Sequence, residues 1–415
     1  MTISKISKEL IQSSKCWKPS LHNGYLQDTN SWFTLRKKQM YKDTEKESII
    51  DTTNIRCEKV QIKPTIKQIN VLLTWFELSR IAYNLTINKL RKDNTIAFRP
   101  MRNKIKQAMR DDSYINSLVK NSGIYQHTLD NAVKDVYKAR KTAFANLKGK
   151  NIKFFRMRYK KQKHHIKNLV IETTELDKLG KGFKKEGLKD LQPNITIKTN
   201  KTVRLGYNSR NKKFTIYVPY EKKTEVKLNR NDICALDPGI RTFQTLYSPE
   251  GITYQFGDEN DIIQKDIDKI EKVKEFKDKS WYKKYTSRIR ERIQNRIADL
   301  HWKVSSFLCK NFNTILIGNM STKGIVKNNL HKKTKRMVYA LSHYLFKERL
   351  KSKAEEYSCK FKIVDESYTS KTCGNCGEIH DNLGSSEKFQ CPKQSCYYRM
   401  HRDIHGARNI YIKNK

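Results

Sequence analysis

Four cysteines near the carboxyl end of the chain have the spacing of a metal site. Cys373 and Cys376 form a CxxC pair, and Cys391 and Cys396 form a CxxxxC pair after fourteen intervening residues. Four thiolates in two short turns fill the coordination of one tetrahedral Zn²⁺ and leave no open position, so the predicted site is structural. Two disulfides are the alternative, but the five other cysteines are scattered singly, as is typical of a reducing compartment.

Two aspartates stand where a phosphodiester-cleaving site would need them. Asp237 ends a predicted buried strand in DICALDPGI, and Asp403 begins a predicted helix in HRDIHGARNI. A two-metal site takes three or four carboxylates from the strand ends and a helix of one sheet, around ions about 4 Å apart. An aspartate before Pro-Gly is by itself more often a turn former. Its pairing with the cysteine motif and the RDxxGARN pattern favours the catalytic interpretation.

The composition indicates a nucleic-acid partner. The chain has 415 residues, enough for two to four domains, with 86 Lys and Arg against 42 acidic residues and a formal charge of +44. The excess runs along the whole length, which predicts several basic surfaces facing a large polyanion. No run of about 18 apolar residues is present and the first residues lack an apolar signal core, so we expect a soluble, intracellular protein with no membrane partner.

The amino-terminal half is predicted to hold a helical lobe and a small sheet. A strand at 59–64 leads into a helix opened by Pro64-Thr65, and a second helix is predicted at about 125–147. Residues 150–225 alternate in short runs such as NITIKTN, TVRLGY and KFTIYVPY, separated by polar turns. This pattern predicts a small antiparallel barrel or meander.

The carboxyl-terminal half must position the two aspartates. The strand before Asp237 and a hairpin closed at 249–251 begin a sheet of the ribonuclease H type. Residues 260–310 are predicted to form one long helix with an apolar stripe along one side. Buried strands follow at 314–320 and 361–366, and the run GARNIYIKNK is predicted as a closing helix.

The order of these motifs resembles that of TnpB transposon nucleases and their eukaryotic and viral relatives, the Fanzor proteins. LDPGI, TILIGNMSTKG, ESYTSKTCGNCG, the second cysteine pair and HRDIHGARNI carry the resemblance, over roughly residues 230–415. It continues more weakly upstream, in KPTIKQINVLLTWFELSRIAYN and TLDNAVKDVYKARKTAFANLK. The resemblance implies a multidomain α+β protein, with a helical recognition lobe and a small β-barrel wedge before a ribonuclease H-like (RuvC) α/β domain that holds an inserted zinc ribbon.

The resemblance also implies a domain order and a function. The domains are an N-terminal extension at 1–55, a wedge-type β-barrel at 56–66 and 150–228, a helical recognition domain at 67–149, a RuvC-like nuclease domain at 229–372 and 397–415, and a zinc ribbon for target nucleic acid at 373–396. The function is RNA-guided DNA cleavage. A guide RNA from the transposon end pairs with double-stranded target DNA beside a short adjacent motif, and the protein is a monomer in the ribonucleoprotein. In a eukaryotic or virus-infected host the location would be nuclear.

One departure from the family concerns the third carboxylate. Most TnpB proteins carry a catalytic glutamate where this chain has Gly318, and the neighbouring Asn319 has no charge. The strand FKIVDE should lie beside TILIGN, about 4.8 Å away, so Glu366 could lean into the space at Gly318, as the relocated glutamate of Fanzor proteins suggests. We therefore predict that Asp237, Glu366 and Asp403 hold two Mg²⁺ ions. Asp365 is the alternative, although strand alternation directs it to the opposite face.

Other departures lie around the last carboxylate. His401 and His405 stand where the family commonly has Asp and Asn, and Arg402 resembles a family arginine placed to contact the scissile phosphate. Two other functions stay open at this point. The vacancy at Gly318 is compatible with a catalytically inactive RNA-guided DNA-binding protein, and transposases that join DNA ends also use carboxylate triads on this fold.

Overall fold

The computed structural model describes residues 54–415 except 192–196, 198, 225–229, 258–259, 328–329 and 385. The chain divides into two compact units, Ile55–Lys222 and Lys223–Lys415. The predicted extension up to residue 53 and most of the run NITIK lie outside the described residues. None of the described helices combines the length and the apolar character that a membrane crossing needs.

The first unit holds a four-stranded sheet with the strand order β1-β4-β3-β2. Its strands are β1 (Asn54–Ile62), β2 (Ile166–Ile171), β3 (Val203–Asn208) and β4 (Lys213–Lys222). Strands β2, β3 and β4 pair antiparallel in sequence order, which confirms the predicted meander. Closure of this sheet into a barrel stays a prediction.

Four helices accompany that sheet. They are α3 (Ile66–Lys92), α4 (Phe98–Asp111), α5 (Ser113–Ser122) and α6 (Gln126–Lys148). The helices predicted to open at Thr65 and to span about 125–147 are confirmed as α3 and α6. Thr65 caps α3 in a reciprocal capping box with Gln68, which satisfies two backbone N–H groups at the helix start. Helices α4 and α5 were not predicted.

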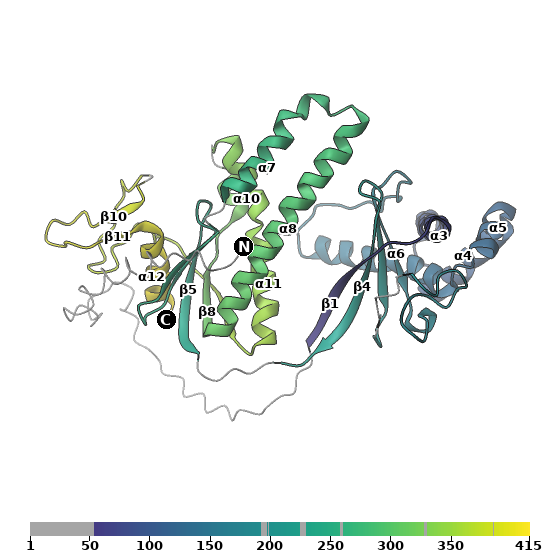
Figure 1. The fold of residues 1–415 in the computed structure, drawn as a ribbon, viewed down its shortest axis with the longest axis horizontal. Coiled ribbons are helices and arrows are strands. Elements are labelled where there is room, and N and C mark those ends of the chain that lie inside the picture. The colour runs from purple at the N-terminus through teal and green to yellow at the C-terminus, as the bar shows by residue number, and fades with distance from the viewer. Residues whose placement is uncertain are drawn as a thin grey trace. The chain divides into compact units, whose positions relative to one another are not determined.

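The second unit is built on a mixed five-stranded sheet with the order β7-β6-β5-β8-β9 (Figure 1). Its strands are β5 (Asn231–Pro238), β6 (Gln244–Tyr247), β7 (Thr253–Phe256), β8 (Phe312–Gly318) and β9 (Lys360–Val364). The predicted hairpin is confirmed, because β6 and β7 pair antiparallel. Strand β8 pairs in parallel with β5 and with β9, so the predicted adjacency of TILIGN and FKIVDE is also confirmed.

Helices cover both faces of this sheet. They are α7 (Asn260–Lys272), α8 (Ser280–Asn311), α9 (Thr322–Lys327), α10 (Lys332–Leu341), α11 (His343–Glu356) and α12 (Arg402–Asn414). Cys234 and Leu236 of β5 join the core formed with α8 and α11, whereas the intervening Ala235 packs against Ile410 of α12. The alternation of a strand therefore sends neighbouring residues to opposite helical layers.

The prediction of one long helix at 260–310 is wrong in one respect, because the chain forms two helices there. A short 3-10 turn, η3 (Lys274–Phe276), separates α7 from α8. The polar run KEFKDKS lacks the apolar stripe that holds a helix on a core, so the chain reverses at this point. The stripe itself is confirmed further on, where Ile289, Ile293 and Ile297 of α8 are buried.

Candidate active site

The carboxyl ends of three parallel strands form one edge of the five-stranded sheet, here called the carboxylate edge. Asp237 lies at the end of β5, Gly318 ends β8, and Glu366 follows β9 by two residues. The register pairs Gly318 with Val364, and β8 stands between β5 and β9. The sheet therefore brings Asp237 and Glu366 to the two sides of Gly318.

Strand alternation directs these residues toward α12. Ala235, Leu316 and Val364 pack with Ile410 of α12 on one face of the sheet. Asp237, Gly318 and Glu366 are each two residues further along and so share that face. Helix α12 carries Asp403 in its first turn, where the helix dipole favours a negative charge.

The side chain of Glu366 lies directly over Gly318. A Cβ atom at position 318 would collide with Glu366 Oε2, and it would meet Pro238 Cδ at 3.1 Å and Ile410 Cδ1 at 3.2 Å. Only glycine leaves room for the carboxylate in this position. Glu366 was expected to reach into the space at Gly318, and its carboxylate lies there. Its catalytic role stays a prediction.

A second glycine makes room for Asp237. Gly406 lies within α12, and a Cβ atom there would collide with Asp237 Oδ2. Glycine in a helix interior lowers the stability of the helix by about 1 kcal/mol relative to alanine. At Gly406 this loss accompanies the close approach of the Asp237 carboxylate, which a larger residue would prevent. The motif HGARN carries this signal, since a glycine inside a predicted helix points to a packing demand.

The buried carboxyl groups resist ionisation. Burial, followed by the nearby charges of Asp403 and Glu366, raises the pKa of Asp237 well above its ordinary value, and Arg402 opposes this shift. Burial also raises the pKa of Glu366 to about 7, against the opposing charge of Lys347 and with a smaller contribution from Asp365. The edge thus gathers acidic groups whose negative charges are mutually unfavourable.

Glu366 has an oxygen available for a ligand, whereas Asp365 is engaged elsewhere. The Oε2 atom of Glu366 is buried and accepts no hydrogen bond from the described residues. Asp365 Oδ2 instead accepts hydrogen bonds from Ser367 Oγ at 2.6 Å and from Lys413 Nζ at 2.7 Å. Oxygen ligands of this kind fit Mg²⁺, and a bound cation would relieve the charge repulsion at the edge.

Lys347 of α11 was not predicted as part of this site. Its Nζ atom donates a hydrogen bond to Asn319 Oδ1 at 3.1 Å, and its side chain is largely buried. No helix was predicted between 320 and 360, so the sequence offered no reason to select this lysine. The structure places it beside the residue that follows Gly318, with its charge acting on Glu366.

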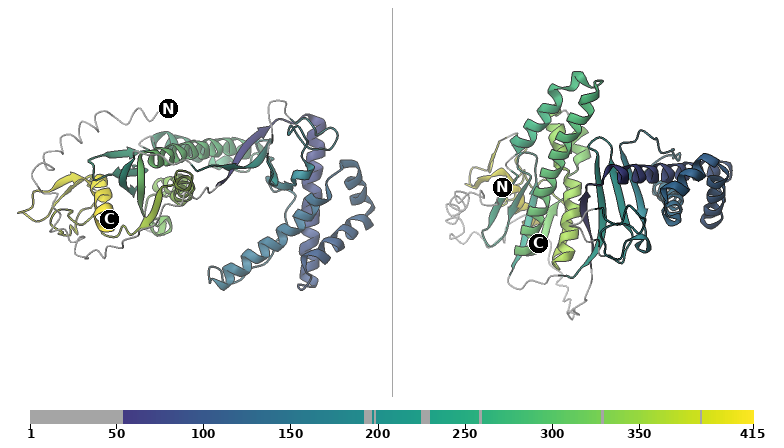
Figure 2. Two further views of the ribbon diagram at one scale, coloured as in Figure 1. Left: turned by 90° about the horizontal axis from the view of Figure 1, so that it is seen from below. Right: turned by 45° about the vertical axis from the view of Figure 1, so that its right-hand side comes forward.

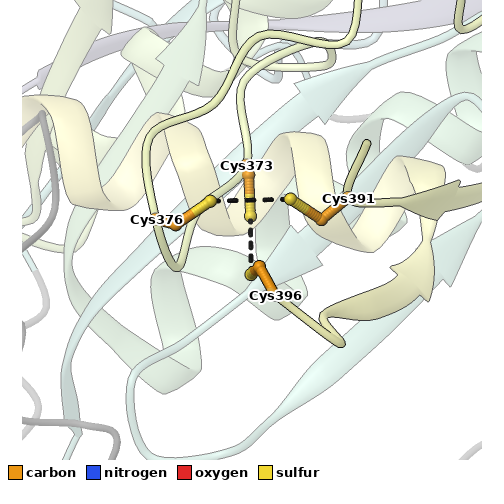
Figure 3. Close-up of side chains that lie close together, drawn as sticks. All are labelled: Cys373, Cys376, Cys391 and Cys396. Carbon is orange, nitrogen blue, oxygen red and sulfur yellow. Dashed lines mark hydrogen bonds between the residues drawn. The ribbon is translucent and has the colours of Figure 1, made fainter. Parts of the chain in front are cut away.

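The four cysteines converge on one point (Figure 3). Their sulfur atoms all lie within 4.8 Å of one another, with Cys373 Sγ 3.9 Å from Cys396 Sγ and Cys376 Sγ 3.5 Å from Cys391 Sγ. A disulfide needs about 2.05 Å between sulfurs, so these are four separate thiols. Sulfurs bound to one tetrahedral Zn²⁺ at about 2.3 Å stand about 3.8 Å apart, which these spacings match. Within the described part of the chain, these four thiols form a group whose ligand atoms could hold one metal ion.

His405 joins α12 to the cysteine segment and is not free to bind a metal. Its Nε2 atom donates to the Thr372 carbonyl oxygen at 2.9 Å, its Nδ1 atom lies 3.2 Å from the Tyr398 hydroxyl, and its ring stacks on Phe389. Burial lowers the pKa of His405 to about 3, which keeps the ring neutral. The residue is a structural link between Asp403's helix and the cysteines.

Arg402 and His401 flank the start of α12 differently. Arg402 Nη1 donates to the carbonyl oxygens of Gly384 at 2.7 Å and Ser386 at 3.3 Å, so its guanidinium lies on the segment between the cysteine pairs. The Nδ1 atom of His401 is buried with no hydrogen-bond partner among the described residues. A direct role of either residue at a phosphate stays a prediction.

Comparisons with known proteins assign the family. Residues 343–410 match the family model described as Cas12f1-like, TNB domain. The chain is 31% identical over 392 residues to a TnpB-like protein of Acanthamoeba polyphaga mimivirus, an alignment that covers 86% of this chain and 72% of that protein. The chain therefore belongs to the TnpB-like family.

Two further similarities are more distant. A Streptomyces pristinaespiralis protein named as an RNA-guided DNA endonuclease is 25% identical over 180 residues, which cover 42% of this chain and 43% of that protein. A cryo-EM structure of a Cas12f1-sgRNA-target DNA complex matches with a TM-score of 0.46 and 11% identity, over 86% of this chain and 98% of that chain.

Proposed function

We propose that this protein is an RNA-guided DNA endonuclease with a RuvC-like active site formed by Asp237, Glu366 and Asp403. The observation that carries the proposal is the seat of Glu366 over Gly318, because it returns a third carboxylate to the position that the family's usual glutamate would occupy. The strand order β7-β6-β5-β8-β9 supports a ribonuclease H-like domain. A relocated glutamate of this kind supports a Fanzor-type member of the family.

The three carboxylates are proposed to hold two Mg²⁺ ions. When bound, the ions would activate a water molecule and stabilise the leaving 3′ oxygen of the phosphodiester. The chain itself supplies the oxygen ligands, excludes a Cβ atom at positions 318 and 406, and places Asp403 in the first turn of a helix. The raised pKa values of Asp237 and Glu366 support this assignment, since clustered acids of this kind ionise readily only beside a cation.

The four cysteines are proposed to bind one structural Zn²⁺ in a ribbon between residues 373 and 396. Strand β10 (Lys388–Gln390) lies within this segment and pairs antiparallel with β11 (Arg399–His401), which follows it directly. Strand β11 leads directly into α12, so the ribbon determines where Asp403 begins its helix. Zinc would thereby act on catalysis through position alone.

Guide and target are inferred from the family and from charge. A formal charge of +44 suits a protein enclosed by nucleic acid. The guide is proposed to be an RNA from the transposon end, whose base pairing selects a double-stranded DNA target beside a short motif read by the first unit. In a eukaryotic or virus-infected host, such a protein would act in the nucleus.

A catalytically inactive, guided DNA-binding protein is the second candidate. One observation favours it, namely that residue 318, where the family usually has its third catalytic glutamate, is a glycine. In that case Glu366 would only end a strand. A transposase that joins DNA ends is a third, weaker candidate, which the cysteine segment before Asp403 does not favour.

The test is cleavage of a guide-matched plasmid by protein copurified with its RNA. Wild type is compared with Asp237→Ala and Glu366→Ala, and Asp365→Ala serves as the matched control because its carboxylate binds Lys413 and Ser367 instead. We expect magnesium-dependent cutting by wild type and the control only. Binding without cutting by wild type would establish the guided binder, joined products would establish the transposase, and loss of activity in the control alone would reassign the third ligand.

A further inference from the structure

The tip of the helical hairpin formed by α7, η3 and α8 carries exposed aromatic side chains. Phe276, Trp281 and Tyr285 are 40%, 46% and 39% exposed, respectively. The centroid of the Trp281 ring lies 5.7 Å from that of Phe276 and 6.0 Å from that of Tyr285. We call these three residues the tip cluster. Single exposed apolar side chains are common, whereas several in contact indicate a binding surface.

The tip cluster does not belong to the core that holds α8 on the sheet. The buried residues of α8 begin at Thr286 and continue through Ile289 to Cys309. The core around them contains none of the three aromatic residues. Because each of the three side chains is about two-fifths exposed, part of each ring meets water, and covering that apolar surface with a flat ligand would be favourable.

Positive charge surrounds the tip cluster. Residues 273–285 contain five lysines and two acidic residues. Lys274 lies 4.0 Å from Glu271, and the other four lysines form no ion pair with any residue that the structure describes. Lysines beside exposed rings are the combination by which proteins hold single-stranded nucleic acid, because ammonium groups attract phosphates and rings stack on bases. Paired bases offer no such face.

The hairpin projects on the side of the carboxylate edge. Helix α8 ends at Asn311 and β8 begins at Phe312, so the two elements run antiparallel from this junction (Figure 1). The start of α8 therefore lies toward the carboxyl end of β8. The 32 residues of α8 span about 48 Å, and the 7 residues of β8 span about 23 Å. The start of α8 therefore extends about 25 Å past the carboxyl end of β8. Figure 2 shows the hairpin of α7 and α8 projecting beyond the five-stranded sheet.

We propose that the tip cluster is a stacking platform for unpaired nucleotides of the DNA strand that reaches the carboxylate edge. This inference rests on the proposed endonuclease function, which requires a DNA strand at Asp237 and Glu366. An extended strand of a few nucleotides spans the distance from that edge to the tip. Stacking on Trp281 and its neighbours keeps the strand unpaired and holds it in line with the carboxylates.

The test measures binding without cleavage, so an inactive nuclease still gives an answer. The ribonucleoprotein with Asp237→Ala is titrated with a fluorescein-labelled oligothymidine and, separately, with its duplex with oligoadenine. Trp281→Ala with Tyr285→Ala is expected to weaken binding of the single strand about 10-fold or more, since each stacked base contributes about 1–3 kcal/mol, and to leave duplex binding unchanged. The double variant Trp281→Phe with Tyr285→Phe keeps two aromatic rings and is expected to bind the single strand as tightly as the parent protein.

Trp302→Ala is the matched control, because Trp302 lies on the same helix with 45% exposure but faces Arg349 away from the tip. Unchanged single-strand affinity in the double alanine variant overturns the proposal, as does an equal loss for single strand and duplex. A change in oligomeric state on size-exclusion chromatography would assign the tip cluster to a protein contact, and loss of the copurified RNA would assign it to the guide. Failure of wild type to cut plasmid overturns only the endonuclease function.

Discussion

The cysteine cluster and the carboxylate edge are both candidate metal sites, but the structure assembles them to different degrees. The four sulfurs already lie within 4.8 Å of one another. Backbone hydrogen bonds shape their turn, from Gly377 N to the Cys373 carbonyl at 2.9 Å and from Cys373 N to the Glu378 carbonyl at 2.7 Å. At the carboxylate edge, in contrast, the acidic groups oppose each other's ionisation and one oxygen of Glu366 has no donor.

The difference follows from charge. Protonated thiols are nearly apolar, so backbone turns and burial can gather them without a metal. Carboxylates repel one another in a partly buried site, so their final approach requires a cation. We infer that the cysteine cluster is a permanent part of the fold, whereas the carboxylate edge closes only with its ions and substrate.

The largest expected effect comes from removing one ligand of the cysteine cluster. Cys373→Ser should abolish zinc binding, because a structural zinc contributes on the order of 10 kcal/mol to the fold around it. The segment 373–401 should become sensitive to protease, and cleavage of DNA should be lost with the position of Asp403. Zinc content measured by mass spectrometry and limited proteolysis check this, with the exposed Cys57→Ser as control. A variant with full zinc content would contradict a four-thiolate site.

The next largest effect concerns the seat of Glu366. Gly318→Ala places a Cβ atom against Glu366 Oε2, so the carboxylate must move and cleavage should fall about 100-fold, the scale expected for a displacement of about 1 Å. Gly324→Ala, where an added Cβ meets only Ser321 atoms, is the control.

The same site offers a rescue. In Glu366→Gly, adding Gly318→Glu returns a carboxylate to the family's usual position and should recover part of the lost cleavage. Normal cutting by Gly318→Ala would show that the position of Glu366 is irrelevant.

Much of this architecture is readable from sequence because it depends on local pattern. The buried strand before Asp237, the hairpin at 249–251 and the capped start at Thr65 each carry their own signal of alternation, turn or cap. Parallel pairing of TILIGN with FKIVDE follows from the family topology. Helices α4 and α5 were not predicted, although Met101, Ile105 and Met109 of α4 recur at helical spacing. The break at η3 was missed because the stripe further along α8 was extended over a polar run that lacks it.

In the candidate site, too, some residues can be predicted from local sequence pattern and others only from the packing of distant elements. Asp237, Asp403 and the cysteines stand out by residue type and spacing, and the alternation of β9 separates Glu366 from Asp365. Lys347 could not be found this way, because its approach to Asn319 arises from the packing of α11 on the sheet. The close contact between Gly406 and Asp237 likewise joins positions far apart in the chain.

A smaller effect concerns pH. Glu366 titrates near 4.5 when unfolded and at about 7 when folded, so between these values the folded state binds more protons. Stability should therefore be greatest below pH 4.5 as far as this group is concerned, and fall as the pH rises to 7, by about 1–2 kcal/mol after solvent screening. Thermal melts in zinc-containing, magnesium-free buffer measure this. Glu366→Gln should flatten the dependence, and a wild-type curve equal to that of the variant would contradict the raised pKa.

The smallest expected effect concerns Lys347, whose charge favours the ionised form of Glu366. In Lys347→Gln the carboxyl group should hold its proton more tightly near pH 7, so a cation must displace it and several-fold more Mg²⁺ should be needed for half-maximal cleavage. Saturating Mg²⁺ should restore the rate, and the exposed Lys351→Gln on the same helix should behave as wild type. A lower magnesium requirement would mean instead that the Lys347 ammonium competes with the ions, and that the carboxylate edge, like the cysteine cluster, is held together before any metal arrives.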